Sequence, residues 1–327
     1  MNRLSFLSTI SAALTLALVS GAASGQTKWD LPAAYPAGNF HTENIAQFAK
    51  DVEAATGGKL KITVHANASL FKAPEIKRAV QGGQAQIGEI LLVNFENENP
   101  IFGVDGIPFL ASSFADSKKL YAAQKPVLDK ALGAQGMMLL YAVPWPPQGL
   151  YVKKEIASVA DMRGVKWRAY SPATAKMAEL IGAQPVTIQA AEVSQAFATG
   201  VVDSMMSSGS TGYDSKIYES VKYWYDTQAW LPKNAVIVNI KAFNALDAAT
   251  QAAVTKAAAD AETRGWKVSA EKNDWYKAEL TKKGMKIMQP SAKLAADLKQ
   301  VGSIMLADWE KKAGPDGQAI ISAYRKK

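Results

Sequence analysis

The chain has 327 residues, 48% hydrophobic and 20% charged, with a formal net charge of +8 and no cysteine. This composition is ordinary for a soluble globular protein, and the lack of cysteine excludes disulfides and a lipid-modified cysteine, so the fold must depend on core packing. The lysines are scattered and not interleaved with aromatic residues in a patch, so we expect no nucleic-acid partner.

The first 25 residues predict a secretory signal peptide. Arg3 is the only charge before an apolar run from Leu4 to Val19, and small residues fill positions 20–25. A basic start, a short apolar core and a small-residue cleavage region are typical of signal peptides, whereas a membrane span needs ~20 apolar residues. We therefore expect a periplasmic protein whose mature part forms one large or two medium domains.

The next elements predict an α/β fold. A strand is predicted over residues 28–31, and a turn-rich loop follows at 35–39. Apolar residues at helical spacing predict a helix over 42–56, which Gly57 and Gly58 end, and alternation predicts a strand over 60–64. Strand, helix and strand in this order are typical of α/β proteins.

Two segments, 75–87 and 192–204, share one pattern. Each has a glutamate, an alanine four residues later, a glycine eight later and a polar residue eleven later. The pattern predicts a short helix, a left-handed glycine at its end and a turn that leads into a strand. Such units are common in α/β proteins, yet two copies about one lobe apart suit a receptor with two similar lobes.

Residues 247–283 predict one long helix, since Gly265 is their only glycine and they contain no proline. A helix of ~36 residues is roughly 54 Å long, longer than one lobe, so we expect it to run along both. A coiled coil is the alternative, but no heptad repeat is sustained. A strand over 285–288 and a helix capped by Ser291 and reaching about residue 312 should follow.

No enzyme motif is apparent. His41 and His65 are far apart, and the chain lacks a zinc-protease motif, a nucleophile elbow, a phosphate-binding loop with its lysine and a dinucleotide fingerprint. The hydroxyl-rich segment 207–212 is expected to contact a ligand or to cap the next helix. We predict a binding protein with no cofactor and no metal; a periplasmic lyase or hydrolase acting on a carboxylate is the alternative.

Three strand ends are expected to meet at one site, because ligands of α/β sheets bind beyond the carboxyl ends of the strands. These ends are residues 91–94, 166–170 and 205–208. Arg168 lies in the second and offers a planar fork of donors that matches a carboxylate. A salt bridge within the protein is the alternative role for this arginine.

The segment Asp161-Met162-Arg163-Gly164-Val165-Lys166-Trp167-Arg168, with residues 182–185 and 192–203 after it, resembles the solute-binding proteins of tripartite ATP-independent periplasmic (TRAP) transporters. The resemblance covers essentially the whole mature chain. It implies a receptor with two α/β lobes and a long helix spanning both. Lobe I would hold residues 26–145 and 234–273, and lobe II residues 146–233 and 274–327.

The resemblance also implies that Arg168 grips the carboxylate of an organic acid, which a monomeric receptor delivers to integral-membrane TRAP permease subunits. A receptor for an ATP-driven transporter or a sensor kinase would need the same kind of pocket. Two positions depart from the acidic-sugar receptors of the family: Gln148 stands where many have a second arginine, and Ser207 where many have an asparagine.

Aromatic and methionine side chains are expected around the cleft, although two or three of them should be ordinary core residues. With few polar partners, an aromatic or other apolar monocarboxylate fits better than a sugar acid, whose hydroxyls would lose hydrogen bonds. The expected ligand-binding residues are Tyr35, Leu91, Asn94, Trp145, Gln148, Trp167, Arg168, Tyr170, Met206, Ser207 and Trp230, with Met205 beside them.

Overall fold

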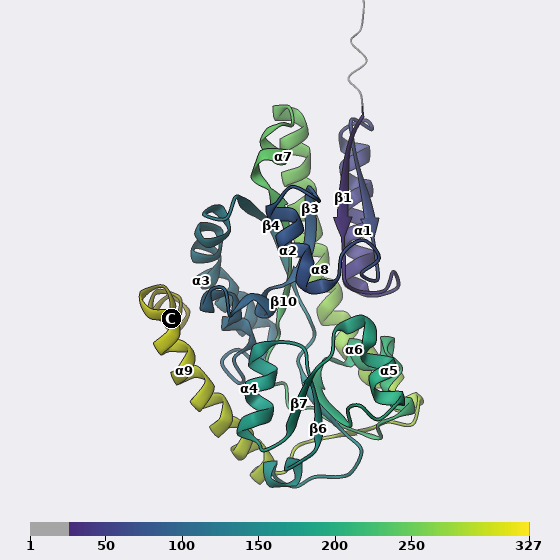
Figure 1. Cartoon of the computed structure of the whole chain (residues 1–327), viewed down its shortest axis with the longest axis vertical. Coiled ribbons are helices and arrows are strands. Elements are labelled where there is room, and N and C mark those ends of the chain that lie inside the picture. The colour runs from purple at the N-terminus through teal and green to yellow at the C-terminus, as the bar shows by residue number, and fades with distance from the viewer. Residues whose placement is uncertain (1–25, 327) are drawn as a thin grey trace, which may run out of the picture.

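The computed structural model describes residues 26–326, so the expected signal peptide, residues 1–25, lies outside the described residues. Figure 1 shows two lobes stacked along the long axis, with α8 running from one into the other and α9 along one side. Among the helices within residues 26–326, none is both long and apolar enough to span a lipid bilayer.

Lobe I, the upper half in Figure 1, is built on two small sheets. The first pairs β1 with β2 in parallel, and the second has the antiparallel order β3-β10-β4. The strands are β1 (Thr27–Pro32), β2 (Leu60–His65), β3 (Ile87–Leu91), β4 (Met137–Pro144) and β10 (Lys233–Asn239). The helices are α1 (Phe40–Ala55), α2 (Ala73–Gln81), α3 (Phe114–Gly133) and α7 (Ile240–Asn244), with the 3-10 turns η1 (Leu92–Phe95) and η2 (Pro100–Gly106).

Lobe II is built on a six-stranded mixed sheet of order β11-β9-β5-β8-β6-β7. The strands are β5 (Gly149–Val152), β6 (Lys166–Ala169), β7 (Gln184–Thr187), β8 (Ser204–Ser207), β9 (Tyr223–Tyr225) and β11 (Lys286–Met288). The helices are α4 (Pro172–Leu180), α5 (Val193–Ala198) and α6 (Gly209–Asp214), with the 3-10 turns η3 (Val159–Met162), η4 (Ala190–Glu192) and η5 (Ile217–Glu219).

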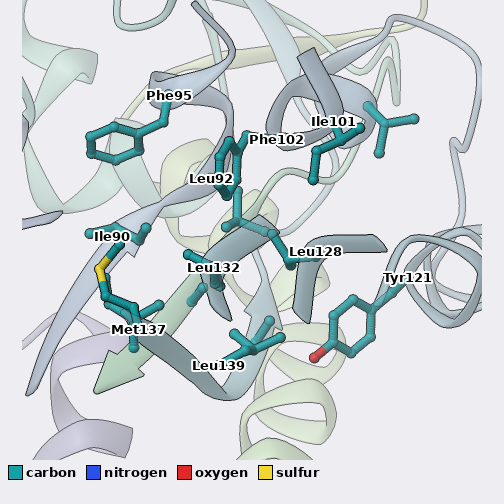
Figure 2. Close-up of a cluster of buried hydrophobic side chains, with 14 of the residues drawn as sticks. Ile90, Leu92, Phe95, Ile101, Phe102, Tyr121, Leu128, Leu132, Met137 and Leu139 are labelled. Carbon is teal, nitrogen blue, oxygen red and sulfur yellow. The ribbon is translucent and has the colours of Figure 1, made fainter. Parts of the chain in front are cut away.

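One core of lobe I fills the space between its three-stranded sheet, α3 and the turns η1 and η2. Figure 2 shows Leu128 and Leu132 of α3 beside Leu139 of β4, close to Leu92 and Phe102. These side chains are buried, and each buried leucine or phenylalanine contributes about 1.5–3 kcal/mol to stability. The core holds β3 and β4 on either side of β10, the strand that enters lobe I from lobe II.

The predicted long helix is present as α8 (Ala248–Lys282), and it packs against α1 and β4 in lobe I and against α6 and β11 in lobe II. Gly265 makes the close approach to lobe I possible: an added Cβ would lie 2.3 Å from a methyl carbon of Val143 and 2.9 Å from Nδ2 of Asn44. The two repeated units also have the predicted form, because Gly83 and Gly200 follow their helices at φ +76° and +72°.

The last helix, α9 (Ala292–Arg325), departs from the sequence expectation. Ser291 caps it as predicted, accepting a hydrogen bond from the amide of Leu294. The helix breaks at Gly314 (φ 57°, ψ −141°) but then continues to Arg325. Trp309 and Ile320 are buried in the core of lobe I, so this end of the chain does not belong to lobe II as the expected boundary 274–327 had it.

Candidate ligand site

A cavity of about 650 Å³, open to solvent at its mouth, lies between the lobes. Both lobes and the chain segments that join them supply its walls. Its lining residues are Ala34, Tyr35, Pro36, Asn39, Ala73, Leu91, Asn94, Trp145, Gln148, Arg168, Tyr170, Gln189, Ala190, Ser207, Ser208, Thr211, Asp214, Ser215 and Pro232. Within residues 26–326, no cluster of three or more metal-ligating acidic, histidine or cysteine side chains is present.

Arg168 projects into this cavity from the end of β6 and is only 4% exposed. Its Nε donates to the carbonyl of Ile188 at 2.9 Å, and its guanidinium carbon lies 4.9 Å from the ring centre of Tyr170. In the described part of the chain, no carboxylate lies within 4.0 Å of it, and its terminal amino groups form no hydrogen bond to protein. Burial lowers the pKa of Arg168 to about 10, still far above neutrality. The cavity therefore contains a buried cation without a counterion.

Gln148 and Tyr170 form one wall beside this arginine. The indole N–H of Trp230 donates to the Tyr170 hydroxyl at 3.1 Å, and this hydroxyl donates to Oε1 of Gln148 at 3.4 Å. Nε2 of Gln148 donates to the carbonyl of Pro146 at 2.9 Å. Because a side-chain amide has two N–H donors, one donor of Gln148 remains for a ligand.

Asn94 and Ser207 add polar atoms to the cavity lining. Oδ1 of Asn94 is buried without a hydrogen-bond partner. Ser207, the last residue of β8, is 3% exposed and lines the cavity. The next residue, Ser208, caps α6 by accepting from the amide of Thr211 at 3.3 Å, one of the two roles predicted for this hydroxyl-rich segment. Buried polar groups without partners are rare, so they point to a bound molecule or water.

Another wall of the cavity is aromatic, and a series of buried hydrogen bonds supports it. The rings of Tyr35 and Trp145 meet edge to face at 4.8 Å. The indole N–H of Trp145 donates to Oδ1 of Asn234 at 2.9 Å, and Nδ2 of Asn234 donates to Glu89 at 2.8 Å. Glu89 and Asn234 were not predicted from the sequence, because they lie on β3 and β10 and no local pattern links them.

Glu89 should make stability depend on pH. Burial raises its pKa to about 7, and the hydrogen bond from Asn234 only partly opposes this. The folded protein thus holds this proton more tightly than the unfolded chain, with its ordinary pKa of 4.5, so this glutamate should lower the free energy of unfolding as pH rises from 4.5 to about 7. Glu89→Gln should remove that contribution and gain roughly 3 kcal/mol at pH 8. Thermal unfolding of both proteins between pH 4 and 8 measures the difference, and parallel curves would contradict it.

Three residues expected at the ligand do not line the cavity. Trp167, Met206 and Trp230 are buried together in the core of lobe II, and Met205 lies in a second core cluster of that lobe. Side chains alternate along a strand, so Trp167 points away from the side that Arg168 takes. Trp230 acts on the site only indirectly, through its hydrogen bond to Tyr170.

Several cavity residues were not named individually from the sequence, although Thr211 lies in the hydroxyl-rich segment 207–212 that was expected to contact a ligand or cap a helix. Asn39 precedes α1, and Thr211, Asp214 and Ser215 come from α6 and its end. The spacing of these last three places them on one helical face directly after Ser207, which the sequence alone could have indicated. Asn39 had no such indication, because its lobe II neighbours are far away in the chain.

A two-lobed α/β fold with an unpaired, buried arginine in a cavity between the lobes is the arrangement expected of a solute receptor. The model of bacterial extracellular solute-binding protein family 7 (DctP) matches residues 33–312, and the chain belongs to this family. The predicted relation to TRAP solute-binding proteins is thereby confirmed, and the chain is a receptor and not an enzyme.

Three solved structures are similar over the whole described fold, each with a TM-score of 0.91 and covering 92% of this chain. DctP6 of Bordetella pertussis, an extracytoplasmic solute receptor binding pyroglutamic acid, is 66% identical, and this chain covers 100% of it. DctP7 of the same organism, also described as binding pyroglutamic acid, is 48% identical, with 100% covered. A marine metagenome TRAP solute-binding protein specific for pyroglutamate is 47% identical, with 99% covered.

Proposed function

We propose that this protein captures pyroglutamate in the periplasm and delivers it to the membrane subunits of a TRAP transporter. The observation that carries the proposal is Arg168, a buried cation without a counterion in the cavity between the lobes. An unpaired buried charge is heavily penalised, so a carboxylate that enters the cavity gains a strong partner. The three similar receptors described as binding pyroglutamate support this choice of acid.

The lactam ring of pyroglutamate suits the remaining polar atoms. With its carboxylate on Arg168, its single N–H can donate to Oδ1 of Asn94, which is buried without a partner. Its carbonyl can accept from the free amide hydrogen of Gln148 or from the hydroxyl of Ser207. The ring carbons would then pack on Trp145. In this way one small molecule would bind to polar groups of both lobes, and such binding favours the closed state over the open one.

The aromatic acid that the sequence led us to expect is not supported. The receptors similar to this chain are described as binding pyroglutamate. An aryl group would leave Oδ1 of Asn94 without a partner in a closed cavity and would not use the remaining donor of Gln148. Each buried polar group left unsatisfied costs about 1–3 kcal/mol. The expectation of a ligand with a single carboxylate is kept, because pyroglutamate is a monocarboxylate.

The test is calorimetric titration of the mature protein with L-pyroglutamate, phenylacetate and glucuronate. We expect one pyroglutamate to bind per monomer. At a ligand concentration 100 times the Kd, the free energy of unfolding should rise by about 2.7 kcal/mol. Phenylacetate and glucuronate should bind far more weakly. Tight binding of either of these acids with no response to pyroglutamate would overturn the ligand assignment and leave the receptor assignment intact.

A further inference from the structure

We propose that Asp214 makes this receptor select monocarboxylates over dicarboxylates. Asp214 lies on the last turn of α6, at the position where this helix lines the cavity. Among the described residues that line the cavity, Asp214 is the only acidic side chain and Arg168 the only basic one. This inference rests on the proposed function for its choice of probes.

The carboxylate of Asp214 is held in place across the cleft. Nδ2 of Asn39, which precedes α1 in lobe I, donates to Oδ2 of Asp214 at 2.8 Å, and the Ser210 hydroxyl donates to the same oxygen at 3.2 Å. The amide of Asn39 is itself oriented, because its Oδ1 accepts from the backbone N–H of His41 at 3.0 Å. Burial raises the pKa of Asp214; these two donors oppose that rise and fix the direction of the carboxylate.

This carboxylate forms no direct ion pair, although the more distant charge of Lys272 acts to lower its pKa. In the described structure, no lysine, arginine or histidine nitrogen lies within 4.0 Å of it, and Oδ1 accepts no hydrogen bond from protein. The lining of the cavity therefore carries one basic and one acidic side chain, Arg168 and Asp214, that are not paired with each other. A monocarboxylate uses the positive charge of Arg168 and leaves Asp214 facing the neutral part of the ligand.

A dicarboxylate of similar length should bind less favourably. Its second carboxylate has no cation in the cavity and shares a partly desolvated space with Asp214. Like charges brought together in this way are strongly disfavoured, which is a general means of excluding a wrong ligand. A neutral amide or lactam at the same place is tolerated, and its N–H can donate to the free Oδ1.

The experiment compares glutarate with its monoamide, glutaramate, since the two differ only in whether the far end carries a charge. Affinities are measured by calorimetry for the wild type, Asp214→Asn and the control Glu219→Gln, an exposed carboxylate on η5 that does not line the cavity. Asparagine can still accept the hydrogen bonds of Asn39 and Ser210, so this variant removes chiefly the charge.

We expect the wild type and Glu219→Gln to prefer glutaramate by at least about tenfold, and Asp214→Asn to reduce this ratio by at least about tenfold. An unchanged ratio in Asp214→Asn, or a wild-type preference for glutarate, would overturn the inference. Asp214→Ser serves as a second variant if Asp214→Asn does not fold, and the same ratio decides. Failure of the proposed function would be seen separately, because the wild type would then not bind pyroglutamate. In that case the affinity ratio is measured with whichever monocarboxylate binds and its matched dicarboxylate.

Discussion

Replacing Arg168 by methionine is expected to weaken pyroglutamate binding by about 3–5 kcal/mol, a factor of roughly 10² to 10⁴ in Kd. The variant would leave the ligand carboxylate buried without a partner in a cavity that has no other cation among its described lining residues. Arg168→Lys should lose less, because it keeps the charge but not the planar fork that binds both carboxylate oxygens. Calorimetric titration measures each Kd.

Arg168→Met should not lower the thermal stability of the ligand-free protein. Arg168 is buried, has no counterion and has its pKa lowered to about 10 by burial, so its charge opposes folding when no ligand is present. An unfolding temperature for Arg168→Met at or above that of the wild type is the expected result. Arg163→Met, at an exposed position outside the cavity, is the matched control and should keep wild-type affinity. Tight binding by Arg168→Met would mean that the site lies elsewhere.

Replacing Asp105 by alanine is expected to destabilise the fold by about 3–5 kcal/mol without touching the cavity. The side chains of Asp105 and Lys233 are 1% and 0% exposed, and Nζ of Lys233 lies 3.5 Å from Oδ2 of Asp105. The same oxygen accepts from the backbone N–H of Lys233 at 2.8 Å. Burial raises the pKa of Asp105 and lowers that of Lys233, so removing either partner leaves the other charge uncompensated.

Two comparisons separate this effect from a general loss of packing. Asp105→Leu combined with Lys233→Met should recover much of the lost stability, because apolar residues often replace a buried ion pair without cost. Asp260→Ala breaks the exposed pair of Lys256 and Asp260, 77% and 55% exposed, and should cost at most about 0.5 kcal/mol. Urea unfolding measures all the variants, and equal losses for Asp105→Ala and Asp260→Ala would contradict the prediction.

Local patterns were sufficient to predict the elements that position Arg168. The arginine lies at the end of β6, the two glycine-ended units have left-handed glycines, and α8 spans both lobes. Each of these features depends on residues close together in the chain: apolar periodicity, a missing Cβ or a long run without proline. The family resemblance pointed to the receptor class for the same reason, since its motif is contiguous.

Side-chain direction was harder to predict. Trp167 and Met206 are next to residues that line the cavity, yet both are buried in the core of lobe II. Adjacent strand residues point to opposite faces, and only the packing of the sheet decides which face meets the cleft. The expected apolar pocket depended on these side chains, and so did the expectation of an aromatic ligand.

The electrostatics of the site were decided by tertiary structure alone. Asn39 and Asp214 are 175 residues apart, Glu89 and Asn234 are 145 apart, and Asp105 and Lys233 are 128 apart. The sequence by itself determined that this is a two-lobed receptor and placed Arg168 at the end of a strand. Which charges are buried, which are paired and which face the ligand depends on contacts between the lobes and between distant strands, because burial sets the energy of a charge and the complete fold sets burial.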